Sequence, residues 1–169
     1  KQLASMQING DAGLDYDRIC YPVSRFDERS VMFDLNYFKY CFLKASGLEY
    51  DENRLQDDFE LMSRQLPQIQ PAGFMYRDFQ SRNVMIKEGK PWFIDFPGGR
   101  RGSVHYDVAS FLWQARAQYP DDLREHLLDE YLAALRATGI TIDTATFRRD
   151  LAGFVLFRIL QVLGAYGFR

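Results

Sequence analysis

The fold of this chain is decided by the stretch Tyr76-Arg77-Asp78-Phe79-Gln80-Ser81-Arg82-Asn83. Its acid, Asp78, is followed five positions later by the amide of Asn83, and the segment Trp92–Phe96 then places a second acid, Asp95, among apolar residues. An acid, an amide and a second acid in this order are typical of the catalytic half of a phosphoryl-transfer site.

The chemistry of phosphoryl transfer explains these residue types. The reaction depends on a positioned acceptor and on cations that neutralise the charge of the transferred group. Because Mg²⁺ prefers oxygen ligands, Asn83 and Asp95 are the predicted metal ligands. Asp78 is the predicted catalytic base, which receives the acceptor hydroxyl and takes its proton. A carboxylate is a weak base, so this proton is expected to move late, when the oxygen is already bonding to phosphorus.

The surrounding sequence predicts how these side chains meet. Residues 74–76 are predicted to form a short strand that runs into the loop, and residues 84–86 and 92–94 to form the two arms of a β-hairpin. Such a hairpin brings Asn83, at the start of one arm, close to Asp95 at the end of the other. A single bound ion can then bridge them.

A simpler interpretation exists for the octapeptide alone. Asp78 and Asn83 are residue types that often make local hydrogen bonds in turns, without any ligand. Short motifs also recur by chance. The predicted hairpin, with Asp95 at the expected distance from the loop, favours the phosphoryl-transfer site over the turn.

The motifs resemble the protein-kinase-like fold, whose kinases carry H-R-D-x-x-x-x-N followed by D-F-G. They resemble more closely the aminoglycoside phosphotransferase family, and within it the bacterial sugar kinases that act on N-acetylmuramate and N-acetylglucosamine. The matching residues are 76–85, 93–96 and 106–110, and the resemblance covers roughly residues 30 to 169. It implies ATP as co-substrate, Mg²⁺ as cofactor and a small-molecule hydroxyl as acceptor.

The resemblance also implies roles for residues around the base. Arg77 joins Asp78 in the expected catalytic set, as a support for the loop. Asp107, in the segment Tyr106-Asp107-Val108-Ala109-Ser110, is expected to brace the loop from below, and Tyr76 is expected to support its structure. No nucleotide-binding residue is assigned.

Three residues depart from the family pattern. Tyr76 stands where histidine is usual, so the orienting role of that imidazole must be replaced or lost. Gln80 stands two residues after Asp78, where protein kinases commonly carry a lysine, and Arg82 is the nearby candidate for the missing charge. Pro97 replaces the glycine of D-F-G, which argues against the mobile switch of regulated protein kinases. The last two departures suit a small-molecule kinase better than a protein kinase.

The sequence before the loop does not resemble an ATP-binding lobe. Kinases of this type use an N-terminal sheet with a phosphate-covering loop and a strand lysine paired to a helix glutamate. Only 77 residues precede Asp78, and Lys39 and Lys44 lie in a helix-like aromatic run. We therefore expect residues 1–169 to be a single C-terminal lobe without the N-terminal lobe, and to turn over little by itself.

The rest of the chain predicts an α+β, mostly helical fold. Apolar residues recur at helical spacing in five stretches, and residues 9–30 are predicted to be a surface loop. These stretches contain Leu35 to Phe42, Leu55 to Leu66 (with Asp51 as cap and Pro67 as stop), Val108 to Ala115, Leu123 to Leu135, and Phe147 to Val162.

Composition restricts the possible partners. The net charge of −2, from 21 basic and 23 acidic residues, gives no electrostatic footprint for nucleic acid. No apolar run approaches the roughly 18 residues that cross a bilayer, so no membrane partner is expected. Cys20 and Cys41 lack metal-type spacing and are expected to be buried thiols in a reducing cytoplasm.

Two classes of function therefore remain open. The first is a small-molecule kinase whose acceptor is an amino sugar by resemblance, with an antibiotic, a choline-like molecule or another hydroxyl compound as alternatives. The second is a non-catalytic, kinase-derived module kept for binding or assembly. The absent lobe, Tyr76 and Gln80 favour the second class; the intact set of Asp78, Asn83 and Asp95 favours the first.

Overall fold

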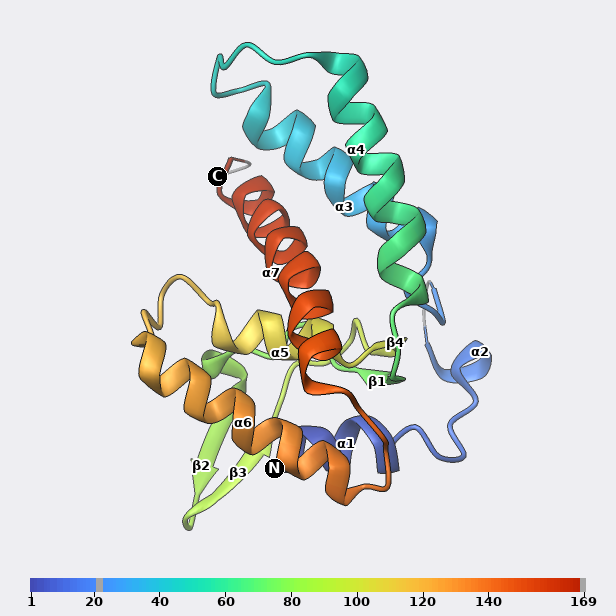
Figure 1. Cartoon of the computed structure of the whole chain (residues 1–169), viewed down its shortest axis with the longest axis vertical. Coiled ribbons are helices and arrows are strands. Elements are labelled where there is room, and N and C mark those ends of the chain that lie inside the picture. Colours follow the sequence, from blue (N-terminus) through green and yellow to red (C-terminus); the bar gives the residue numbers. More distant parts are fainter. Residues whose placement is uncertain (21–22, 168–169) are drawn as a thin grey trace.

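The computed structural model describes residues 1–20 and 23–167. Helices dominate it, with two small antiparallel sheets, so the expected α+β, mostly helical class is confirmed (Figure 1). The helices are α1 (Gln2–Asn9), α2 (Tyr16–Ile19), α3 (Glu28–Phe38), α4 (Glu52–Gln65), α5 (His105–Leu112), α6 (Asp121–Ala137) and α7 (Thr144–Gly167). The strands are β1 (Ala72–Met75), β2 (Val84–Lys87), β3 (Lys90–Phe93) and β4 (Arg100–Ser103).

The predicted hairpin is confirmed as β2 and β3. Val84 pairs with Phe93 and Lys87 with Lys90. The two turn residues between the strands, Glu88 and Gly89, have φ angles of 53° and 72°. Positive φ at both positions is the geometry of a type I′ turn, which matches the twist of a hairpin.

The short strand predicted at residues 74–76 is confirmed as β1, which starts two residues earlier, but its partner β4 and their pairing were not predicted. β1 leads into the octapeptide, and its last residue, Met75, pairs with Arg100 at the start of β4. This pairing anchors the chain on both sides of the hairpin. The octapeptide and the acid after β3 therefore emerge from one small β region.

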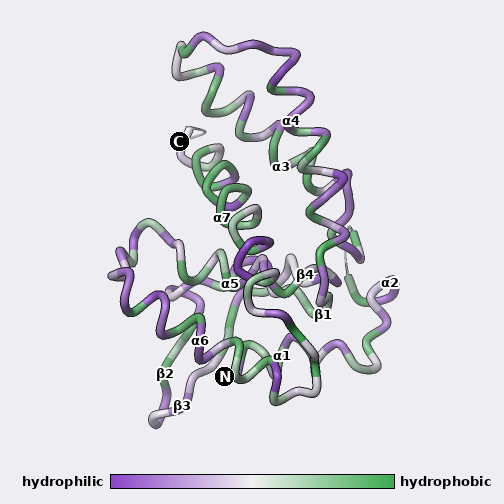
Figure 2. Tube along the Cα trace, viewed as in Figure 1, coloured by the Kyte–Doolittle hydropathy of each residue, from purple (hydrophilic) through white to green (hydrophobic). Residues whose placement is uncertain are grey.

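The helices surround this β region. α3 and α4 pair at one end of the molecule, and α7 runs from them toward α5, packing against both α3 and α5 (Figure 1). α1 packs against β1 and α6. Along the trace, apolar residues concentrate on α7 (Figure 2). The inner faces meet in a core that includes Leu35, Tyr106, Leu132, Phe154 and Phe157.

The prediction of a loop over residues 9–30 is wrong in two places. Asp15 accepts a hydrogen bond from the backbone N–H of Arg18 and so caps the short helix α2. Asp27 accepts one from Ser30 at 2.8 Å and starts α3 inside the predicted loop. Both errors have the same cause, because an aspartate that suits a turn also caps a helix. The cap predicted at Asp51 is confirmed, since its side chain accepts from two N–H groups of α4.

α7 is, within the described residues, a helix long and apolar enough by length and composition to cross a membrane. Its apolar character is an average over the helix; Arg158 still interrupts its apolar residues, so the expectation that no uninterrupted apolar run of that length exists stands. The inner face of α7 nevertheless belongs to the core, and its buried Arg158 donates hydrogen bonds to Tyr106 at 2.8 Å and Ser110 at 3.1 Å. Cys20 and Cys41 are free thiols, as expected, but each is half-exposed and not buried.

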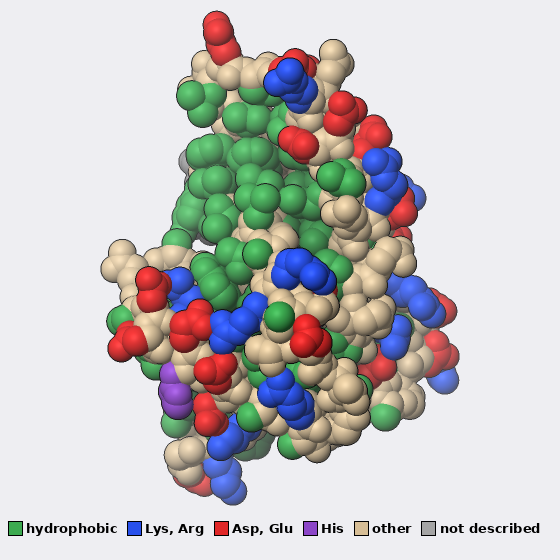
Figure 3. Space-filling view, in the orientation of Figure 1, with side chains coloured by type: hydrophobic (Ala, Val, Ile, Leu, Met, Phe, Trp, Pro, Cys, Tyr) green, Lys and Arg blue, Asp and Glu red, His purple; other side chains and the backbone are tan. Residues whose placement is uncertain are grey.

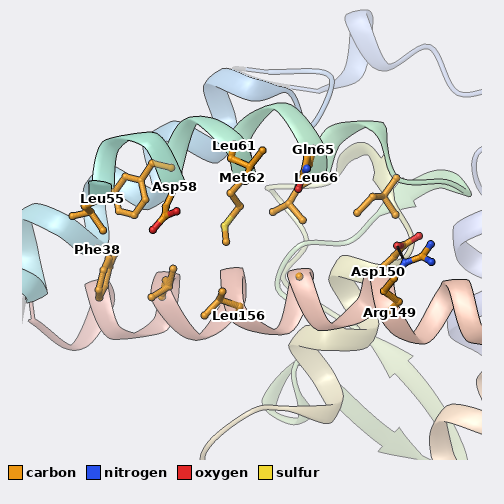
Figure 4. Close-up of a pocket in the computed structure, with 14 residues that line it drawn as sticks. Phe38, Leu55, Asp58, Leu61, Met62, Gln65, Leu66, Arg149, Asp150 and Leu156 are labelled. Carbon is orange, nitrogen blue, oxygen red and sulfur yellow. Dashed lines mark hydrogen bonds and ion pairs between the residues drawn. The ribbon is translucent and has the colours of Figure 1, made fainter. Parts of the chain in front are cut away.

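A groove of about 620 Å³ runs between α4 and α7 and is lined mainly by apolar side chains (Figure 4). Apolar side chains gather on this face of the molecule (Figure 3). Leu55, Met62 and Leu66 line it from one side, and Leu156 and Leu160 from the other. None of its lining residues comes from the octapeptide or the hairpin. The groove is therefore separate from the candidate site.

Candidate active site

One buried carboxylate binds the backbone of the loop that starts at Tyr76. Asp107, on α5, is fully buried and accepts the backbone N–H of Tyr76 at Oδ2 and that of Arg77 at Oδ1, each at 2.9 Å. Two adjacent N–H groups on the two oxygens of one carboxylate fix the chain direction immediately before Asp78. A charged acceptor makes such hydrogen bonds stronger than neutral pairs.

The next residue, Arg77, is held through its side chain. Its guanidinium contacts both carboxylate oxygens of Asp34 on α3, at 3.1 and 3.2 Å. Asp34 also accepts a 2.8 Å hydrogen bond from Gln161 on α7. The φ angle of Arg77 is 77°, a left-handed conformation that side chains other than glycine rarely adopt. Arg77 thus supports the loop and points into the protein.

Asn83 joins the loop to the hairpin. Its side-chain Nδ2 donates a 2.8 Å hydrogen bond to the backbone carbonyl of Asp78. Its backbone carbonyl accepts the N–H of Ile94 at 3.1 Å. Because Ile94 directly precedes Asp95, these two bonds bring the three predicted positions together. Asp95 itself has a φ of 65°, so the chain turns sharply at this acid.

Tyr76 makes a further connection between the same segments. Its hydroxyl donates a hydrogen bond to the backbone carbonyl of Ile94. The ring packs edge-on against Phe79 in the loop, with centroids 5.5 Å apart. Tyr76 therefore ties the loop to the strand end that precedes Asp95.

The site carries an excess of negative charge around this phenol. Burial, together with the nearby carboxylates of Asp95, Asp107 and Asp78, raises the pKa of Tyr76 to about 12. Burial also raises the pKa of Asp107 to about 6, although the N–H groups of Tyr76 and Arg77 and the amide of Gln7 oppose the rise. A cation is the natural complement of such a cluster.

The donor set fits a hard cation. Because Nδ2 of Asn83 is committed to the Asp78 carbonyl, Oδ1 is the amide atom left for a metal. Among residues 1–20 and 23–167, no donor binds the carboxylate of Asp78 or Asp95. The same residues contain no group of three or more His, Cys, Asp and Glu side chains that could hold a metal. A metal here would need Asn83 and phosphate oxygens to complete its shell.

Three residues behind the site were missed by sequence reasoning. Asp34 carried a signal, because it is the one acid on the apolar face formed by Val31, Leu35 and Phe38. Gln7 and Tyr131 lie on helices whose apolar patterns gave no hint of the loop. The hydrogen bond from Gln7 to Asp107 and that from Tyr131 to Gln7 depend on long-range packing.

Comparison with known proteins identifies the class. Residues 24–142 match the phosphotransferase enzyme family, APH. This match covers more than half of the chain and includes the loop, the hairpin and Asp107. The chain therefore belongs to the phosphotransferase enzyme family.

Individual relatives agree with this family. The chain is 27% identical over 146 residues to an N-acetylmuramate/N-acetylglucosamine kinase of Neisseria meningitidis serogroup B, which covers 83% of the chain and 44% of that protein. It is 32% identical over 101 residues to the kinase of the same name from Pseudomonas aeruginosa, covering 57% of the chain and 29% of that protein. The expected resemblance is confirmed, and the chain spans less than half the length of these relatives.

Proposed function

We propose that this chain is the C-terminal, catalytic lobe of an ATP- and Mg²⁺-dependent kinase that phosphorylates a hydroxyl group of an amino sugar. The observation that carries the proposal is the pair of hydrogen bonds from Asn83, one to the Asp78 carbonyl and one from the Ile94 N–H. They bring the backbone segments that carry an acid, an amide and a second acid next to one another, with Asn83 buried, Asp78 half-buried and Asp95 exposed.

Each residue has a defined task in the proposed reaction. The acceptor hydroxyl binds the carboxylate of Asp78, and its oxygen attacks the γ-phosphorus of ATP. The bond from that phosphorus to the bridging oxygen breaks, ADP leaves, and the proton passes to Asp78. Asn83 Oδ1 and Asp95 would hold Mg²⁺, which would supply positive charge to neutralise the phosphates. Asp107 and Arg77 keep the loop in position.

The hairpin offers a surface for the nucleotide. Met85 and Trp92 are cross-strand partners, so their side chains lie on the same face of the hairpin, and both are more than half exposed. Ile94, next to Asp95, is 45% exposed. An apolar surface beside the metal acid suits a purine base, with a separate N-terminal lobe as the expected cover.

The identity of the acceptor rests on the relatives. Both are named for N-acetylmuramate and N-acetylglucosamine, which makes an amino sugar the first candidate acceptor. An aminoglycoside antibiotic and a choline-like molecule are the competing acceptors. The bond from Tyr76 to Ile94 supports a working site over a non-catalytic module, because it restores the link that the missing histidine would otherwise have left open.

The test is phosphate transfer by the longest native form of the protein. We expect ³²P from γ-labelled ATP to reach N-acetylglucosamine or N-acetylmuramate. Asp78→Asn should lower kcat by about 100-fold or more, since general bases contribute this much. Asp122→Asn, at an exposed position of α6, is the matched control and should leave kcat unchanged. Equal turnover by wild type and Asp78→Asn would remove Asp78 from the mechanism.

A further inference from the structure

The side chain of Gln7 lies behind the catalytic loop, fully buried on α1. Its Nε2 donates to Oδ2 of Asp107 at 3.0 Å and to the backbone carbonyl of Val104 at 3.1 Å. Its Oε1 accepts the hydroxyl of Tyr131 at 2.6 Å. A reversed amide would set its oxygen against two acceptors, so these partners allow one orientation only.

Two successive hydrogen bonds, through the carboxylate of Asp107, link Gln7 to the backbone that leads into Asp78. The oxygen of Asp107 that accepts from Gln7 also accepts the N–H of Tyr76, and the other oxygen accepts the N–H of Arg77. The two loop N–H groups bind one to each oxygen of the carboxylate, and the amide of Gln7 adds a third donor to Oδ2. Each further donor restricts the rotation of the carboxylate.

We propose that Gln7 is a positioning residue, which sets the orientation of Asp107 and through it the place of Asp78 in the catalytic loop. The functional part of this inference rests on the role proposed above for Asp78. The effect of the Gln7–Asp107 hydrogen bond on the loop is a property of the fold, and it can be measured without substrate.

The packing of α1 leaves Gln7 little freedom. Gly73 of β1 lies so close to α1 that a Cβ atom at this position would come within 2.3 Å of the backbone carbonyl oxygen of Gln7. α1 therefore rests directly on the strand that enters the loop. Tyr131, on α6, holds the amide of Gln7 from the other end. One glutamine thus connects α1, α5 and α6 behind the strand that leads to Asp78.

The competing explanation is that Gln7 merely fills a polar gap in the core. The two explanations differ in what happens to the loop when the amide is removed but its volume is kept. If Gln7 orients Asp107, loss of its donor weakens the hydrogen bonds of the Tyr76 and Arg77 N–H groups selectively. If Gln7 only fills space, its loss lowers the stability of the whole protein, and the loop opens no more often than its surroundings.

The experiment uses Gln7→Met in the 169-residue chain, because methionine has a similar length and no amide. We expect amide hydrogen exchange, followed by NMR, to accelerate about tenfold at Tyr76 and Arg77, the scale of one charge-assisted hydrogen bond. Exchange at Ile94 should not change, because its N–H is bound to Asn83 and not to Asp107. Gln56→Met, at a half-buried position of α4 where the amide bonds Glu60, is the control.

A second measurement follows the carboxyl carbon of Asp107 through a pH titration. In a dry site, loss of the Gln7 donor removes support for the charged form, so the midpoint moves above its starting value of about 6. Entry of water after general loosening would move it down. Arg158, the charged side chain that also acts on Asp107, is unchanged in this variant.

Tyr131→Phe provides an independent variant if Gln7→Met folds poorly. It removes only the hydroxyl that holds Oε1 of Gln7, so the same changes are expected at smaller size. Equal acceleration at Tyr76 and Ile94, no acceleration in either variant, or a downward shift of the Asp107 midpoint would each overturn the proposal. Since no readout involves phosphate transfer, such a failure is distinct from a failure of the Asp78→Asn assay.

Discussion

The guanidinium of Arg77 lies 3.1 Å from a carboxylate oxygen of Asp34, and this pair joins the loop after β1 to a helix more than forty residues away. The side chain of Asp34 is 6% exposed and that of Arg77 is 21% exposed. Burial raises the pKa of Asp34, while Arg77 and the hydrogen bond from Gln161 oppose the rise. The pair is therefore an interior one, and removal of one partner leaves the other poorly solvated.

Asp34→Asn should lower the free energy of unfolding by about 2 to 4 kcal/mol, because it leaves Arg77 without its charged partner. Urea unfolding followed by circular dichroism measures the change. Asp57→Asn, at an exposed position of α4, is the matched control and should cost less than about 0.5 kcal/mol. A cost for Asp34→Asn as small as that of the control would show that the pair does not stabilise the loop.

Tyr76→Phe should lower the free energy of unfolding by about 1 kcal/mol, since the carbonyl of Ile94 loses its donor in a part-buried place. Tyr50→Phe is the matched control, because the hydroxyl of Tyr50 bonds Glu52 at the surface. The same unfolding assay measures both. Equal costs for the two variants would mean that the bond to Ile94 contributes no more than a surface contact.

The fold shows which parts of the structure a sequence can reveal. The hairpin and the long helices were predictable because their signals are local: alternating or helical apolar spacing, turn residues and a capping aspartate. The strand pair β1–β4 was missed because Met75 and Arg100 meet across the whole hairpin, and residues 100–103 have a polar, glycine-containing sequence with no strand pattern.

The candidate site divides in the same way. Asp78, Asn83 and Asp95 were predicted from spacing and chemistry, since all three lie within one loop and one hairpin. Asp107 and Arg77 were predicted as supports from the family resemblance, but their partners were missed, because Asp34 lies 43 residues from Arg77 and Gln7 lies 100 residues from Asp107. A single sequence carries no record of which distant polar groups will be buried together.

Mn²⁺ in place of Mg²⁺, added with ATP, tests the proposed metal ligands. Its unpaired electrons should broaden the NMR signals of Asn83, Ile94 and Phe96 and leave those of α6 sharp. Asp95→Asn should abolish the broadening, because a carboxylate is replaced by a neutral amide. Asp121→Asn, on exposed α6, is the control. Broadening that persists in Asp95→Asn would place the ion elsewhere.

His105 should make the stability of the protein sensitive to mild acid. Its ring is 1% exposed, stacks on Phe147 at 3.8 Å between centroids, and lies 2.8 Å from the hydroxyl of Ser103. Burial lowers the pKa of His105 from 6.5 to about 3. The unfolded chain therefore binds a proton below pH 6.5 that the folded protein does not. The stabilisation from this residue is complete above pH 6.5 and is lost as the pH falls toward 3, by about 1.4 kcal/mol per pH unit.

Asp107 acts in the opposite direction over part of this range. Its pKa is raised from 3.8 to about 6, so between these values the folded protein binds the extra proton and gains stability as the pH falls. In wild type, the opposite effects of His105 and Asp107 on the pH dependence of stability partly cancel between pH 3.8 and about 6. Comparison with His105→Gln isolates the histidine, since Asp107 is common to both proteins.

The free energy of unfolding should therefore be measured for wild type and His105→Gln at pH 7 and pH 4.5. From pH 7 to pH 4.5, we expect the free energy of unfolding of wild type to fall by roughly 2 to 3 kcal/mol more than that of His105→Gln. His126→Gln, the same substitution at an exposed position of α6, should keep a constant difference from wild type. A difference between wild type and His105→Gln that stays constant with pH would mean that the buried ring takes up its proton without unfolding the core around Phe147.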